Sequence, residues 1–168
     1  MTTNANAPST VKTTFRERLF PQRIDNTYRG YKIALVLFGL VAAVRALQSI
    51  LIIVNGHSIA KSADGIPLET YPAAAAQTIV AIFAISSLNR LIISLICAVV
   101  LVRYRSAVPL MFVVLGLSYL GGQLISQFIP IVRVGTPPGI YMNLFLFATT
   151  IVGLGLSLFE RGNRLRRD

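Results

Sequence analysis

One stretch decides the fold: residues 33–54 read IALVLFGLVAAVRALQSILIIV, an apolar run broken only by Arg45, Gln48 and Ser49. A helix of ~20 predominantly apolar residues crosses a hydrocarbon core about 30 Å thick. An Arg at the centre of such a helix costs roughly 2.5–3.5 kcal/mol on an insertion scale. The run contains 14 Ile, Leu, Val and Phe residues, whose favourable transfer outweighs that cost. We therefore expect a membrane-spanning helix here, ended by Asn55 and Gly56.

Three further segments of the chain have the same character. Residues 73–102 contain Asn89 and Arg90, whereas residues 107–129 and 140–159 carry no formal charge. A spanning segment must satisfy its own backbone hydrogen bonds, so each is expected to be a helix. The second run is longer than a bilayer needs and should tilt or project from it. The sequence predicts an all-α protein, an integral membrane four-helix transmembrane bundle over residues 33–159, with helices at 33–54, 73–102, 107–129 and 140–159.

The composition of the whole chain agrees with this prediction. Of 168 residues, 54% are apolar and only 13% are charged, whereas a soluble domain carries about 25% charge. This argues against a soluble enzyme, and a single Cys excludes a disulfide scaffold. The net charge of +10 is clustered outside the apolar runs, where topology and anionic lipid headgroups explain it. No folded basic domain is left to bind nucleic acid.

The distribution of Lys and Arg predicts the orientation. Twelve of them fall on one side of the four spans, and only Lys61 and Arg133 fall on the other. The positive-inside rule then places both termini in the cytoplasm, an N-in/C-in topology. We expect a basic cytoplasmic arm (1–32), a basic cytoplasmic tail (160–168) and a location in a bacterial inner membrane. The twelve are Lys12, Arg16, Arg18, Arg23, Arg29, Lys32, Arg103, Arg105, Arg161, Arg164, Arg166 and Arg167.

Residues that carry catalytic or cofactor chemistry are scarce. The single Cys97 lies within a span and the single His57 follows the first span, while all six acids lie outside the spans. Haem ligation by two His residues and thiol exchange by paired Cys residues are therefore excluded within one chain. The sequence predicts no enzyme, no cofactor and no metal site. It leaves open whether His57 contacts a ligand.

The most informative constellation is a pair of Arg residues deep in the predicted spans. Arg45 lies 12 residues beyond Ile33, which is about 18 Å along a helix, and Arg90 is also near the centre of its span. An ionisable residue inside the membrane indicates a functional site by default. Polar residues that could share a pocket with these two Arg residues are Gln48, Ser49, Ser86, Asn89, Tyr119 and Gln123.

These two guanidiniums have no carboxylate within the spans. Two cations at low dielectric repel each other, so they need an anion or must point apart. A partner subunit's acid, a lipid phosphate or a bound anionic solute could supply the negative charge. Alternatively, each Arg reaches toward the headgroups or bonds to amides, hydroxyls and backbone carbonyls.

Small residues recur at four-residue spacing on the last two spans. This pattern lets membrane helices approach closely, either inside the bundle or against another subunit. The residues are Ser118, Gly122 and Ser126, followed by Thr149, Gly153 and Ser157.

The leading hypothesis is a small non-enzymatic membrane protein that acts as a subunit or scaffold. It would pack against other membrane proteins, further copies of itself or lipids, anionic headgroups included, through the Arg residues and the small-residue faces. The alternative is an oligomeric transporter or channel for an anionic solute, in which two Arg residues and several amides replace the hydration shell.

Overall fold

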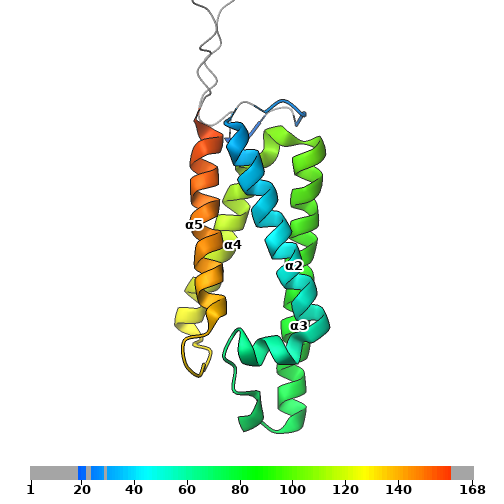
Figure 1. Cartoon of the computed structure of the whole chain (residues 1–168), viewed down its shortest axis with the longest axis vertical. Helices are drawn as coiled ribbons and strands as arrows, with labels where there is room; N and C mark the ends of the chain where they lie inside the picture. The colour runs from blue at the N-terminus through cyan, green and yellow to red at the C-terminus, as the bar shows by residue number, and fades with distance from the viewer. Residues whose placement is uncertain (1–18, 22–23, 29, 160–168) are drawn as a thin grey trace, which may run out of the picture.

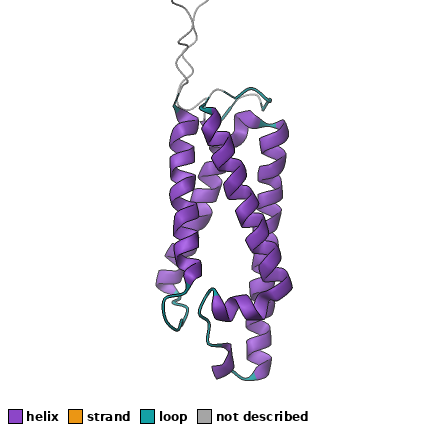
Figure 2. Ribbon diagram, in the orientation of Figure 1, coloured by secondary structure: helices purple, strands orange, loops and turns teal. Residues whose placement is uncertain are grey.

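The structure is a computed structural model that describes residues 19–21, 24–28 and 30–159. All regular elements in these ranges are helical, which confirms the all-α class (Figure 2). The predicted tail and most of the predicted arm lie outside the described residues. Within them, four helices are long and apolar enough to cross a membrane. The elements are α2 (Lys32–Ser62), η1 (Leu68–Thr70), α3 (Ala73–Arg103), η2 (Arg105–Ala107), α4 (Val108–Phe128) and α5 (Pro138–Leu158), shown in Figure 1.

The two ends of the bundle differ in composition. We call one of them the basic end, after Lys32, Arg103 and Arg105; α2 begins there, and α3 and α5 end there (Figure 1). The opposite, loop end contains residues 63–72 and 129–137, and α3 projects there beyond α4 and α5 (Figure 1). Both ends of the described chain therefore lie at the basic end.

Helix α2 is longer than the sequence predicts, because Asn55 bends it without ending it. Asn55 has the non-helical dihedrals φ −122° and ψ 37°, and the helix resumes as far as Ser62. At the bend Gly56 packs on α3, where a Cβ would lie 3.1 Å from a methyl group of Val80. The segment after the bend crosses the loop end toward the start of α5 (Figure 1). The bend thus decides which residues meet at the loop end.

The apolar core lies mostly in the half of the bundle next to the basic end. Helix α2 packs along α3 and α5, and α4 packs along α5, while α3 and α4 touch little. Phe38 of α2 meets Phe112 of α4 edge to face, with ring centroids 5.1 Å apart at 72°. The buried cluster comprises Ala34, Phe38, Val41, Ala42, Cys97, Val100, Ala107, Val108, Phe112, Leu115 and Leu146.

Residues before α2 are tied to this core by hydrogen bonds. The backbone N–H of Asp25 donates to Ser106 Oγ, and Ser106 Oγ donates to the Asp25 carbonyl, both at 2.9 Å. The Tyr31 N–H donates to the Leu156 carbonyl at 3.3 Å. Burial raises the pKa of Tyr28, in the same segment, to about 12. The basic end is therefore closed by packed and hydrogen-bonded chain.

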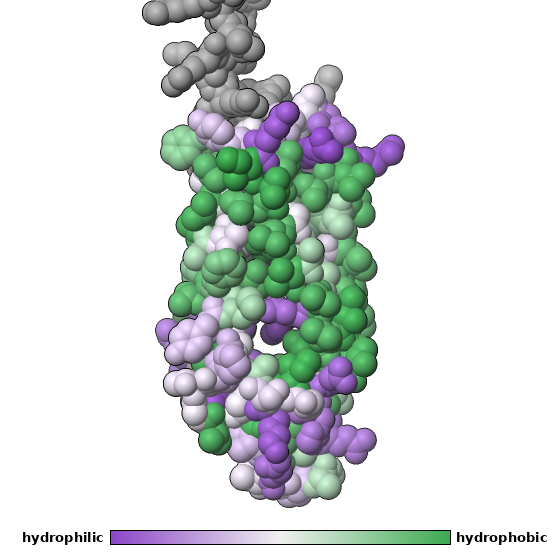
Figure 3. All heavy atoms as spheres, in the orientation of Figure 1, coloured by the Kyte–Doolittle hydropathy of each residue, from purple (hydrophilic) through white to green (hydrophobic). Residues whose placement is uncertain are grey.

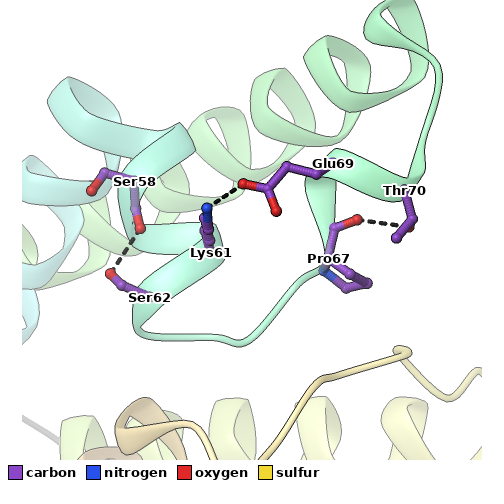
Figure 4. Close-up of polar contacts among 6 residues, drawn as sticks. All are labelled: Ser58, Lys61, Ser62, Pro67, Glu69 and Thr70. Atoms are coloured by element: carbon purple, nitrogen blue, oxygen red, sulfur yellow. Dashed lines mark hydrogen bonds and ion pairs between the residues drawn. The ribbon is translucent and has the colours of Figure 1, made fainter.

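The loop end is braced by local polar contacts around a smaller apolar cluster. Ala60, Ile66 and Leu68 are buried there. Lys61 forms an ion pair with Glu69, which ties the bent end of α2 to η1 (Figure 4). The hydroxyl of Thr70 donates to the Pro67 carbonyl at 2.8 Å within the η1 turn (Figure 4).

Two loops interlock at this end and join α2 to α5. The Val134 N–H donates to the Gly65 carbonyl at 2.8 Å, and the Gly139 N–H donates to the Ala63 carbonyl at 3.0 Å. Gly65 has φ +68°, a left-handed conformation that favours glycine, and a Cβ there would lie 2.9 Å from the Val134 carbonyl. We call this contact between residues 63–66 and 134–139 the loop clasp.

Candidate functional site

Arg45 and Arg90 lie at the same depth on neighbouring helices. Arg45 is 13 residues after Lys32, the start of α2, and Arg90 is 13 residues before Arg103, the end of α3. At 1.5 Å per residue, each is about 20 Å from the basic end. Because α2 and α3 run antiparallel side by side, the two cations lie in one layer of the bundle. We call the layer that contains Arg45 and Arg90 the Arg layer.

The guanidinium of Arg45 is incompletely satisfied. Its side chain is half-buried, and its Nε is fully buried with no hydrogen-bond partner among the described residues. It interacts electrostatically with Arg90 of α3, a like charge, and with Tyr119 of α4. A buried donor without a partner is costly, because its desolvation is not offset by a hydrogen bond. Arg45 Nε therefore lacks an acceptor among these residues.

Tyr119 and Gln123 place hydrogen-bond donors in the same region. The Tyr119 ring stacks on Phe147 of α5, with centroids 4.4 Å apart and planes inclined by 16°. Gln123 Nε2 donates to the Tyr119 hydroxyl oxygen at 2.9 Å. That oxygen acts as the acceptor in this bond, so its own proton is left to donate elsewhere. Two guanidiniums and a phenol thus offer donors to an oxygen anion.

Other predicted contact residues are not brought to this position in the same way. The buried Ser49 hydroxyl donates to the Arg45 carbonyl at 2.8 Å, so it serves the helix backbone. Gln48 and Ser86 are half-buried, whereas Asn89 and Arg90 are exposed on α3. Arg45 thus interacts electrostatically with Arg90 and Tyr119, and Gln123 is bonded to Tyr119.

An opening through the bundle lies in the half of the molecule next to the loop end (Figure 3). Figure 3 shows it between α2 and the α4–α5 pair, with hydrophilic atoms at one edge. We call it the lateral opening, because it faces sideways between helices. The hydrophilic atoms lie at its edge toward the basic end, and apolar surface borders it along α2 (Figure 3).

One carboxylate approaches the Arg layer, and the sequence analysis missed it. Asp64 interacts electrostatically with Arg133 and with Arg90. Burial nevertheless raises the pKa of Asp64 above its ordinary value, and the two Arg residues oppose that shift. Asp64 Oδ1 lies 3.2 Å from the position of a Cβ at Gly139, at the start of α5. Asp64 lies in the loop between α2 and η1, so the prediction that no carboxylate lies within the spans is unchanged.

The two small-residue faces have different surroundings. On α5, Gly153 is buried so closely that a Cβ would lie 2.4 Å from Phe112 Cζ; Ser157 is also buried, and Thr149 is half-buried. On α4, Ser118 and Gly122 are exposed and Ser126 is half-buried. No heavy atom lies within 4 Å of a Cβ at Gly122, outside its own helix backbone and chain neighbours. The α5 face packs within the bundle, and the α4 face is open.

His57 lies at a separate cavity near the loop end. This cavity has a volume of about 400 Å³, and its polar lining residues are His57, Tyr71 and Gln77. The rest of its wall is Leu68, Ala73, Ala76 and Val80. Within the described ranges, no three His, Cys, Asp or Glu residues are grouped so that they could hold a metal ion.

Comparisons with protein-family models, with curated proteins and with solved structures find no match to this chain. The interpretation of the site therefore depends on its own geometry.

Proposed function

We propose that this chain is a small, non-enzymatic integral membrane protein that acts as a subunit or scaffold. It holds a negatively charged group of a neighbouring membrane component between the α2–α3 and α4–α5 pairs. The basic end faces the cytoplasm, because Lys and Arg of the arm, the α3–α4 turn and the tail gather on that side. A bacterial inner membrane is the expected setting.

A single observation carries this proposal: the buried, unpartnered Nε of Arg45 beside the like charge of Arg90. An anion from outside the chain would satisfy the donor and reduce the repulsion together. Binding of an anion is favoured over its conduction through the bundle. Phe38 and Phe112 pack into an apolar core between the Arg layer and the basic end, and this core offers an anion no polar path.

Native-size analysis after purification in a gentle detergent tests the proposal. We expect the wild type to run as an assembly larger than the monomer or to carry a co-purifying component. Arg45→Leu and Arg90→Leu should insert normally and lose that component. Arg103→Leu is the matched control, because Arg103 lies on the same helix as Arg90 but at its basic end. A wild type that is monomeric and free of bound components would overturn the proposal.

Flux into liposomes separates this role from anion transport. We expect no anion uptake by the reconstituted wild type. Uptake that is lost in Arg90→Gln would replace the scaffold proposal with a transporter.

A further inference from the structure

We propose that the lateral opening binds the headgroup phosphate of an anionic phospholipid, with Arg45, Arg90 and Tyr119 as donors. This inference rests on the proposed function and specifies which membrane component the site holds.

The donor set suits a phosphate. Phosphate oxygens only accept hydrogen bonds, and guanidinium donates to them in a geometry that matches two oxygens at once. Arg45 and Arg90 approach from two helices, and Tyr119 approaches from a third with its own proton free to donate. The lateral opening is visible between packed atoms (Figure 3).

The local charge favours a lipid with a net negative headgroup. Arg90 and Arg133 interact electrostatically with Asp64, and Arg45 interacts with Arg90, so these four side chains carry three positive charges and one carboxylate. Phosphatidylglycerol brings one uncompensated negative charge, whereas the choline of phosphatidylcholine cancels its phosphate. Repulsion within the Arg layer is therefore relieved more by phosphatidylglycerol.

The surroundings favour entry from the bilayer. The loop clasp joins α2 to α5 at the loop end. The lateral opening faces sideways and is bordered by apolar surface on which acyl chains can lie (Figure 3). The layer is about 20 Å from the basic end of a core about 30 Å thick, so the lipid comes from the leaflet at the loop end.

Lipid retention by the full chain tests this inference. The protein is placed in nanodiscs of phosphatidylcholine with or without phosphatidylglycerol, released into detergent, and its bound lipids are counted by native mass spectrometry. We expect about one phosphatidylglycerol to be retained per chain. Arg45→Gln and Arg90→Gln should reduce that retention about tenfold, since each removes charge-assisted hydrogen bonds. Arg103→Gln should leave it unchanged.

A second variant protects the test against loss of folding. Tyr119→Phe removes only a hydroxyl, keeps the stacking on Phe147, and should reduce phosphatidylglycerol retention a few-fold. Equal retention of both lipids by the wild type would overturn the lipid inference. Displacement of the lipid by millimolar inorganic phosphate would also overturn it, because the ligand would then be a soluble anion.

The two proposals fail in different ways. If Arg90→Gln releases a co-purifying protein while lipid retention is unchanged, the lipid inference fails and the scaffold function stands. If the wild type carries neither protein nor lipid, both fail.

Discussion

The two halves of this bundle are built from the same four helices but differ in how the helices pack. Toward the basic end, Phe38, Phe112 and Gly153 bring the helices into direct contact, and few polar groups intervene. Toward the loop end, Arg45 is half-buried with an unpartnered Nε, Arg90 is exposed, and an opening remains (Figure 3). The first half resembles a packed protein interior, whereas the second contains unmet hydrogen-bonding capacity. Apolar packing and unpartnered polar groups are therefore separated along the helix axis.

The charge distribution explains why the second half does not close. Two like charges on α2 and α3 repel, and a guanidinium cannot be buried without an acceptor. The loop clasp nevertheless holds α2 to α5 beyond them.

The largest expected effect is in the packed half. Phe112→Ala removes a ring that contacts both Phe38 and the Gly153 position, and should lower the free energy of unfolding by about 3 kcal/mol. This is the low end of the usual range, because lipid already solvates apolar side chains. Thermal unfolding in detergent measures it. Tyr119→Ala, on the same helix in the other half, should cost clearly less, and equal losses would contradict the comparison.

A matched glycine pair sharpens the same contrast. Gly153→Ala places a methyl group against the Phe112 ring and should destabilise by about 2 kcal/mol through overpacking. Gly122→Ala meets open space and should change stability by no more than about 0.5 kcal/mol. Equilibrium unfolding of the two variants in one detergent gives the difference. A large loss in Gly122→Ala would mean that α4 has a neighbour there.

Replacing Arg45, in contrast, should raise the free energy of unfolding. Arg45→Leu removes a buried donor without a partner and should stabilise the isolated chain by about 1 kcal/mol, while it abolishes lipid retention. The same unfolding assay, in detergent without added lipid, measures the gain. A destabilised Arg45→Leu variant would show that Arg45 is already satisfied within the fold.

The smallest expected effect is a change in pH dependence at the loop clasp. The pKa of Asp64 is raised in the folded state, so protonation favours the fold. This stabilisation is complete below the ordinary pKa of 3.8 and is lost as the pH rises through the raised value. Asp64→Asn should keep the stability of the protonated form at all pH values.

Hydrogen exchange of residues 63–66 and 134–139 between pH 3.5 and 7 measures this dependence. The comparison with wild type isolates Asp64 from Glu69, whose pKa is lowered by its bond to Lys61 and whose contribution has the opposite sign. Identical pH profiles for wild type and Asp64→Asn would show that Asp64 is solvated like a surface acid.

Some features of the site could be predicted because they depend only on distance along a helix. Arg45 and Arg90 are each 13 residues from one end of their helices, so their common depth follows from helical rise. Asp64 could not be placed in this way. Its position depends on the bend at Asn55, where Gly56 allows close approach to Val80 of α3. From the sequence alone, the first helix is predicted to end at that point.

By itself, the sequence determined four apolar helices and the depth of their charges, because helix formation and hydropathy are properties of each segment alone. Only the tertiary structure decided which faces meet. Gly153 packs on Phe112 while Gly122 stays open, although both belong to the same kind of small-residue pattern. It also brought Asp64 within electrostatic reach of Arg90. The physical reason is that contacts between helices depend on how the whole bundle is filled, and no single segment contains that information.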